Sequence, residues 1–376
     1  MRLLAVVTSV SVVAGAAGWA QPQSPTAKPK TVPPLSTAVD KGARWLASVQ
    51  GADGGWGQDG GEASSARPGE RLESSGNDVA NTAVAALALL QAGRQYQPQV
   101  ERALAFILQR IEASPADGLA ITDRQGTQIQ RKLGPYIDTF LSSMLLSQID
   151  GHASTPALNA RVRKALQKTV AKIEKHQQAD GSWNIAGGWA PVLGTSMASR
   201  SLFEAKNKGV AVNAAALERA EEYTVSALQT ARSGVGRGVG GGVAAGGGGG
   251  SLAAPAEAAG VALYQNAQAL EQLSRTTADR VQNAKQIGAI QSRLTDAAFV
   301  GGFGSMGGEE FFSYLNISDS MKRVGGDGWS KWHTAITQKI VGLQNSDGTW
   351  AGHHCITGRV AMTSAAILNL TVDRAR

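Results

Sequence analysis

The sequence predicts an all-α fold in which about six helical hairpins close into an α/α toroid, or barrel. One observation is a motif, Gln-x-x-Asp-Gly-x-Trp, that occurs at 50–56, 177–183 and 344–350. A second is that each copy separates an amphipathic segment from a more apolar one. The third is composition: 43% of the 376 residues are hydrophobic and only 17% are charged, which suits closely packed helices.

Each copy of the motif is predicted to be a structural joint at the end of a helix. Glycine after aspartate permits a left-handed turn that stops the helix, and the aspartate satisfies amides in that turn. We expect the tryptophan to fold back onto the helix end and the glutamine amide to bridge to the next hairpin. The motif itself therefore predicts no acid or metal chemistry.

The hairpins are predicted from alternating periodicity along the chain. In each pair the first segment has one apolar stripe and the second is apolar on most faces, so the second belongs inside the ring. Closing the ring removes the exposed ends that an open solenoid must cap. The pairs are 38–49 with 78–90, 99–112 with 135–148, 162–176 with 194–205, 214–231 with 255–273, 278–294 with 309–321, and 332–343 with 359–368.

Two segments are predicted to lie outside this architecture. Residues 1–20 have a basic start, an apolar run and small residues at Gly18 and Ala20, which is typical of a signal peptide, so a periplasmic or extracellular location is expected. Residues 21–37 are predicted to be a disordered leader. A single α/α-barrel domain over 38–376 follows, with a Gly-rich insertion at 233–251.

Composition limits the partners and cofactors. The net charge is +7, but the basic residues are scattered and aromatics make up 5%, which argues against a nucleic-acid surface and indicates solvated helix faces. The glycines of 236–241 match a dinucleotide pattern, but a helix precedes them where the motif needs a strand, so no such cofactor is expected. The only cysteine is Cys355, so no intrachain disulfide forms. We expect a monomer without a transmembrane span.

The segment 41–50 running into Asp53-Gly-Gly-Trp56 resembles the QW repeat of squalene–hopene cyclases. The tail at 332–373 is similar to bacterial exported prenyltransferase/squalene-oxidase repeat proteins. The same barrel occurs in protein prenyltransferase β subunits. The resemblance implies an α/α toroid around a central cavity and says little about the reaction.

The resemblance also implies where a cyclase would carry its acid. Cyclases protonate an alkene through an Asp-x-Asp-Asp motif, and the matching place here is Asp78-Val-Ala-Asn81. The first acid remains, Ala80 and Asn81 replace the other two, and no Asp-Asp pair occurs in the sequence. Asp78 is therefore expected to cap the inner helix that it precedes.

Prenyltransferase β subunits use zinc held by aspartate, cysteine and histidine, so the run His353-His354-Cys355 is a candidate site. His353 and Cys355 are two apart and point to one side in extended backbone. Possible metal ligands are His353, Cys355 and Glu309, and Glu310 or His333 could add a further one. The alternative is a packed, hydrogen-bonded helix start.

Other residues are expected near the same end of the barrel. Arg359 takes the place of Asp78 in register and could pair with it or bind an anion. Tyr136 and Asp138 open the second inner helix. The aromatic residues Phe311, Phe312 and Tyr314 are expected in the core, with lining of an apolar cavity as the alternative.

Two functions remain. The first is a non-catalytic binding or scaffold module whose cavity takes an apolar ligand, a peptide or a partner protein. The second is a divergent terpenoid cyclase or prenyltransferase-like enzyme, with catalytic candidates Asp78, His353, His354, Cys355 and Arg359 and zinc as its cofactor. The missing acids and the incomplete zinc motif favour the first.

Overall fold

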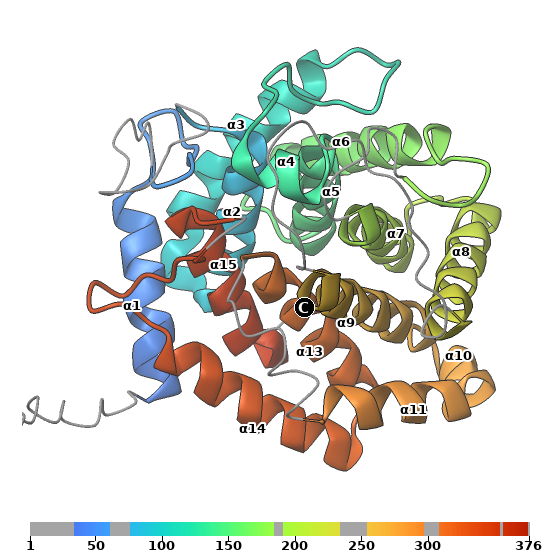
Figure 1. Ribbon diagram of the computed structural model, residues 1–376. Helices are drawn as coiled ribbons and strands as arrows, with labels where there is room; N and C mark the ends of the chain where they lie inside the picture. The colour runs from blue at the N-terminus through green and yellow to red at the C-terminus, as the bar shows by residue number, and fades with distance from the viewer. Residues whose placement is uncertain are drawn as a thin grey trace, which may run out of the picture. The chain divides into compact units, whose positions relative to one another are not determined.

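The computed structural model describes residues 34–60, 76–183, 191–233, 254–296, 308–353 and 356–374. These residues belong to one compact unit, Pro33–Arg376. All regular elements among them are helices, and the described part of the chain has only isolated β-bridges beside them (Figure 1). The predicted all-α class is confirmed.

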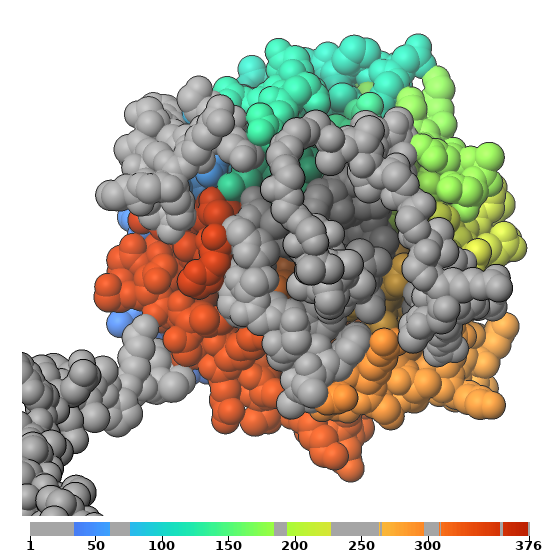
Figure 2. Space-filling model, in the orientation of Figure 1, coloured from blue at the N-terminus to red at the C-terminus, as the bar shows by residue number. Residues whose placement is uncertain are grey.

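Two concentric rings of helices make up this unit (Figure 1). The outer helices are α1 (Leu35–Ser48), α3 (Gln97–Ala113), α6 (Pro156–Lys175), α8 (Ala214–Ser233), α11 (Ala284–Leu294) and α14 (Gly326–Gly342). The inner helices are α2 (Val79–Ala92), α5 (Ile137–Ile149), α7 (Pro191–Asn207), α9 (Ala254–Leu273), α13 (Gly308–Val324) and α15 (Arg359–Leu370). Each inner helix contacts the next, and α15 contacts α2, so the inner ring is closed. In the space-filling view the outer rim follows chain order from teal through green and orange to red (Figure 2).

The apolar pattern explains which helix lies in which ring. Helix α1 buries a single stripe made by Ala38, Val39, Gly42, Ala43 and Leu46, at helical spacing. Helix α2 buries an unbroken run over 79–89. A helix buried on all faces must lie inside the fold, and an amphipathic helix covers it.

The tryptophan of each motif copy joins an outer helix to the inner helix that follows. The three indoles are almost completely buried. Each indole N–H donates to the carbonyl ten residues earlier, with N–O distances of 2.8, 2.7 and 2.7 Å for Trp56, Trp183 and Trp350. Each tryptophan backbone N–H donates to a threonine hydroxyl of the next inner helix, namely Thr82, Thr195 and Thr363. The predicted folding back of the tryptophan is confirmed.

The glutamine of each copy ties its turn to the next outer helix. The Gln50 side-chain amide donates to the carbonyl of Gly54 at 2.8 Å and to that of Gln99, in α3, at 2.9 Å. Gln177 bonds in the same way to Ala216 of α8. Gln344 bonds to Ala38 of α1 at 2.8 Å, so the last joint fastens the last hairpin to the first.

The motif glycines are needed at the turns of the joints. Gly54, Gly181 and Gly348 have φ values of 87, 86 and 90°, a conformation that only glycine adopts freely. A Cβ on Gly54 would also lie 2.5 Å from the carbonyl oxygen of Arg102 in α3. The turn at Gly54 therefore lies so close to α3 that only a residue without a side chain fits there.

Some boundaries differ from the prediction. Helix α1 begins at Leu35, inside the segment 21–37 that was predicted to be a disordered leader. The segment 278–294 is divided into α10 (Thr277–Gln282) and α11, and a short α4 (Gln128–Leu133) lies between α3 and α5. Both short helices begin with a capping box. Each has only six residues, too few for the sequence pattern to distinguish a helix from a turn. The predicted signal peptide at 1–20, and all but the first residue of the insertion at 233–251, lie outside the described residues.

Lys172 corrects the prediction that the basic residues only mark solvated faces. Its side chain is buried, and its ammonium group donates to the carbonyls of Pro115, Gly118 and Ala120 at 2.6, 2.8 and 3.1 Å. This cation organises the loop that follows α3, where unpaired carbonyls favour a positive charge.

Searched over the described residues, no helix is long and apolar enough to cross a membrane.

Candidate functional site

The first turns of α2, α5 and α15 form the end of the ring that we call the N-terminal mouth. Asp78 lies there as the N-cap of α2, as predicted. Its carboxylate is buried and accepts the backbone N–H and the side-chain amide of Asn81, each at 2.8 Å. Asn81, which replaces the last acid of the cyclase motif, thus fixes the Asp78 carboxylate, the first acid of that motif, in place.

A second buried carboxylate reaches the same place from α5. Asp138 accepts the backbone N–H of Ala80 at 3.0 Å and the side-chain amide of Gln130, in α4, at 2.6 Å. The chain has no adjacent pair of aspartates, but folding brings Asp78 and Asp138 together from two hairpins. The sequence feature that could have indicated this pair is Asp138 itself, an acid at the second position of the apolar helix α5, where it is buried.

Burial shifts both carboxyl groups. Burial raises the pKa of Asp78 to about 6, although the bonds from Asn81 oppose the shift. Burial, followed by the nearby Asp78 carboxylate, raises the pKa of Asp138 to about 7. Like charges in a low-dielectric site cannot both ionise cheaply, so the pair retains a proton close to neutral pH.

Stability is therefore expected to depend on these two groups between about pH 4 and pH 7. The folded pKa values lie above 3.8, the ordinary pKa of an aspartate, so the folded state holds protons that the unfolded chain releases. The stabilising contribution is fully present below about pH 4 and is lost as pH rises through about 7. Asp138→Asn should flatten this decline in urea unfolding free energies measured across the window.

A matched control for this prediction is Asp117→Asn. Asp117 is exposed, and its bond to Lys175 lowers its pKa, so its removal should leave the slope between about pH 4 and pH 7 unchanged. An equal slope in the wild type and in Asp138→Asn would show that the carboxyl pair does not titrate in this window.

Arg359 pairs with Asp59 and not with Asp78, so the predicted pairing of Arg359 with Asp78 is wrong. Its backbone N–H and its Nε both bond to the Asp59 carboxylate, at 3.0 and 3.3 Å, and its Nη1 lies 3.5 Å from Asp347. The physical reason is the turn at 57–60, which lies over the start of α15 and accepts the Val360 N–H through the carbonyl of Gln58. The guanidinium is thus already engaged by two carboxylates.

Of the run at 353–355, the structure describes only His353. His353 is exposed, whereas His354, Cys355 and the side chain of Glu309 lie outside the described residues. Within the described part of the chain, no three His, Cys, Asp or Glu side chains gather as metal ligands. The zinc site therefore stays a prediction.

His333 and Glu310, the further ligands considered, are engaged elsewhere. His333 lies 3.8 Å from Asp373, which follows α15, whereas His353 precedes that helix. A helix of 12 residues separates these two ends by about 18 Å, so His333 cannot join His353. Glu310 accepts the hydroxyl of Tyr314 at 3.0 Å.

The zinc hypothesis predicts stoichiometric zinc in the purified protein and its release by Cys355→Ala. Elemental analysis of both proteins measures this directly. A zinc-free wild type whose stability is unchanged by the substitution would contradict the hypothesis.

The aromatic residues of α13 are core, as expected. Phe311, Phe312 and Tyr314 are buried, and the Tyr314 ring packs against Trp332 of α14 with centroids 6.0 Å apart. Tyr314 therefore packs between the inner helix α13 and the outer helix α14.

A cavity of about 280 Å³ lies at the other end of the ring, where inner helices end. We call it the C-terminal cavity. It is lined by Ser147, Gln148, Arg200, Phe203, Glu204, Asn207, Lys208, Asp319, Lys322 and Arg323, from α5, α7 and α13 and the residue after α7. The residues predicted from the sequence to be functional belong to the opposite mouth, and none of them lines this cavity.

Four charged residues of the cavity lining form a network of ion pairs. The Arg200 guanidinium, 8% exposed, lies 2.7 Å from Glu204 and 3.3 Å from Asp319. Asp319 also contacts Arg323 at 3.1 Å. Although burial alone lowers the pKa of Arg200, Asp319 and Glu204 raise it overall, so Arg200 is held in its charged form.

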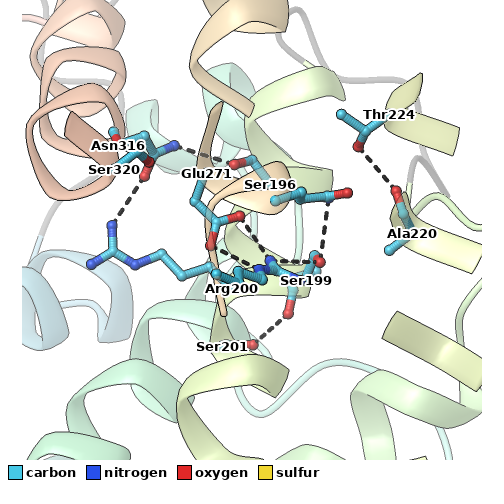
Figure 3. A network of polar contacts seen from close by, with 12 residues as sticks. Ser196, Ser199, Arg200, Ser201, Ala220, Thr224, Glu271, Asn316 and Ser320 are labelled. Atoms are coloured by element: carbon cyan, nitrogen blue, oxygen red, sulfur yellow. Dashed lines mark hydrogen bonds and ion pairs between the residues drawn. The ribbon is translucent and has the colours of Figure 1, made fainter. Parts of the chain in front are cut away.

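The network continues into α9. Glu271 is fully buried and lies 2.7 Å from Arg275, whose guanidinium also bonds to Ser199 at 2.9 Å (Figure 3). Asn316 joins α13 to α7, because it accepts from Arg200 and donates to Ser196, each at 3.2 Å (Figure 3). The interior at this end is therefore polar.

A pattern in the sequence could have indicated this network. Three consecutive inner helices each carry an oppositely charged pair four residues apart: 200 with 204, 271 with 275, and 319 with 323. Such pairs are common on exposed faces. On helices that are otherwise apolar they indicate a charged interior.

Residues 28–119 match the family model of the squalene-hopene cyclase C-terminal domain. The match covers α1, the first joint, α2 and α3. None of the curated proteins and none of the solved structures compared with the chain matches it significantly.

Proposed function

We propose that this chain, a member of the squalene cyclase and prenyltransferase superfamily by its family match and its closed double ring, is a non-catalytic binding module. Its ligand would occupy the interior of the ring. The observation that carries this proposal is the C-terminal cavity of about 280 Å³, which inner helices from different hairpins line together. A ring of packed helices provides a preformed site of this kind at little conformational cost.

The arrangement at the N-terminal mouth supports binding over catalysis. Each carboxylate there already serves the fold: Asp78 caps α2, and Asp138 accepts from the backbone of α2 and from Gln130. Asn81 stands where a cyclase has an acid, and it donates to Asp78. Arg359 is neutralised by Asp59 and Asp347.

We also propose that the protein is exported through the signal peptide at 1–20, which rests on the sequence pattern alone. N-terminal sequencing of secreted or periplasmic protein should find a start near Gln21.

A second function rests on the two buried carboxyl groups of Asp78 and Asp138, which both bond to the first turn of α2 and whose pKa values burial raises to about 6 and about 7. A carboxylic acid that keeps its proton near neutral pH is suited to general-acid catalysis. The alternative is thus a divergent terpenoid cyclase-like enzyme that uses this pair.

Native mass spectrometry of the full chain tests the binding role. The protein would be offered separate pools of isoprenoids, short peptides and hydrophilic small molecules. We expect a one-to-one complex with a member of one pool. The variant Asn207→Trp, at an exposed position on the cavity rim, should weaken that complex by narrowing the opening.

The matched control is Lys206→Trp, which adds the same side chain to an exposed neighbour that does not line the cavity. It should bind like the wild type. A protein that forms no complex with any pool, or whose complex is insensitive to Asn207→Trp, would contradict binding in this cavity.

A further inference from the structure

Helix α4 lies across the N-terminal mouth. The inner ring runs in the order α15, α2, α5 and α7, and each of these helices contacts the next. At one end of α4, the Gln128 side chain bonds to the residues just before α15. At the other end, the Leu133 carbonyl oxygen would lie 2.6 Å from a Cβ on Gly194, in the first turn of α7. Because α4 also contacts α2 and α5, it extends over the starts of all four helices (Figure 1).

Two glutamines of α4 fasten it to the inner ring. The side-chain oxygen of Gln128 accepts the backbone N–H groups of Thr357 and Gly358 at 2.9 and 3.0 Å. The Gln128 amide also donates to the Thr357 hydroxyl at 2.9 Å. The Gln130 amide donates to Oδ2 of Asp138, in α5, at 2.6 Å. The contacts of α4 with the ring are therefore largely made by side chains.

The buried face of α4 lies against the carboxyl pair of the mouth. Leu133 is completely buried on this face, whereas Arg131 is exposed. Gln130 bonds directly to Asp138, and Asp78 and Asp138 are each only 2% exposed. Access to the pair from this side therefore requires α4 to move away.

The stretch of chain before α4 is held in place independently of it. Two lysines of α6 bond to this stretch. Lys168 donates to the carbonyl of Ser114 at 2.6 Å, and Lys172 donates to the three carbonyls described above, as far as Ala120. Helix α4 can therefore move while the base of its loop stays fixed.

A glycine lies on each side of α4. Gly126 and Gly134 have φ values of 76 and 112°, which only glycine adopts freely. A Cβ on Gly134 would have no neighbouring atom within 4 Å, and one on Gly126 would reach only the Arg131 guanidinium, at 4.0 Å. Hinges form at a few loop or terminal residues of this kind, where the backbone can turn without a clash.

We propose that α4 is a hinged lid over the N-terminal mouth, which turns about these two glycines and is latched by the bond from Gln130 to Asp138. Lifting α4 breaks the bonds of two glutamines and exposes one small apolar face, so the lid opens locally and without global unfolding. Opening gives a ligand access to Asp78 and Asp138. The lid lies at the opposite end of the ring from the C-terminal cavity and does not rest on the proposed binding function.

Hydrogen exchange of the full chain, followed by mass spectrometry at several low urea concentrations, tests the lid without any substitution. A helix of six residues is not stable alone, so the amides of Arg131 and Gly134, which bond within α4, exchange once it lifts. We expect this exchange to be faster than that of α5 and nearly independent of urea, because a local opening exposes little surface. Amides of α5 that exchange by global unfolding should accelerate with urea.

Two nearly isosteric variants test the latch. Gln130→Glu keeps the oxygen that accepts the Thr127 N–H but sets a carboxylate against Asp138, so exchange of α4 should rise by about tenfold or more. Gln128→Glu is the control. It makes the same change of charge but keeps the acceptor for two N–H groups at the start of α15, where negative charge is favourable. It should not raise the exchange of α4.

Labelling of carboxyl groups with a water-soluble carbodiimide and an amine tests access to the pair. Leu133→Ala loosens the lid without altering its charges, so it should speed the labelling of Asp138 by about tenfold or more. Leu119→Ala, which truncates another buried leucine in the fixed stretch, is the control and should leave this labelling unchanged.

Exchange of α4 with the urea dependence of α5 would overturn the lid, because α4 would then be a fixed part of the fold. Equal acceleration by Gln130→Glu and Gln128→Glu would overturn the latch. Labelling of Asp138 that ignores Leu133→Ala would overturn the role of α4 in access. None of these results depends on whether a ligand binds in the C-terminal cavity.

Discussion

Replacing Trp350 by alanine is expected to lower the free energy of unfolding by about 3–5 kcal/mol, the range for truncation of a buried large aromatic residue. Trp350 is completely buried, and its indole N–H donates to the carbonyl of Ile340 at 2.7 Å. Its ring also lies against Gly42 of α1, where an added Cβ would come within 2.8 Å. The substitution therefore leaves a cavity where the last hairpin meets the first.

Urea unfolding, checked for two-state behaviour with two probes, measures this loss. The matched control is Trp329→Ala, on helix α14, the outer helix against which the Trp350 indole folds back. Trp329 is half-buried and packs on His333, so its loss should cost roughly 1 kcal/mol or less. Similar effects for the two substitutions would mean that Trp350 does not hold the ring closed.

Arg200→Leu is also expected to be costly, by roughly 3–5 kcal/mol, because it leaves buried acids without their main counter-charge. Glu204 and Asp319 both face Arg200, and Asn316 accepts from it at 3.2 Å. Leucine fills much of the volume, so the loss reports chiefly on the charge. The free energy of unfolding in urea again measures it.

Two comparisons separate this effect from a general loss of packing. Arg161→Leu removes an ion pair with Glu112 in which both side chains are about half exposed, and it should cost no more than about 1 kcal/mol. Adding Glu204→Leu to Arg200→Leu should recover part of the stability, because one stranded acid is removed. A double variant that is less stable than either single one would contradict the electrostatic explanation.

The fold could be predicted because its determinants are local. The motif at 344–350 contains the glycine for the turn, the aspartate that satisfies the turn, and the tryptophan that packs on the preceding helix. What the motif could not show is the partner of its glutamine. That Gln344 reaches Ala38 of α1 follows only once six hairpins have closed the ring.

The candidate site was less predictable because it is assembled from distant segments. The sequence contains no adjacent pair of aspartates, whereas folding brings Asp78 and Asp138 together from two hairpins. The pairing of Arg359 with Asp59 depends on a turn at 57–60 whose path the apolar pattern does not determine. Lys172 looked like a surface residue because helical spacing cannot show which loop will cover it.

The chemical state of the bound ligand tests the binding role most directly. Wild-type protein and Asp138→Asn would be incubated with the pool that yields a complex, and the ligand would be recovered and identified by mass and by NMR. We predict that both proteins return the ligand unchanged. A product of altered structure that the wild type forms and Asp138→Asn does not would contradict the non-catalytic role and identify the Asp78–Asp138 pair as an acid catalyst.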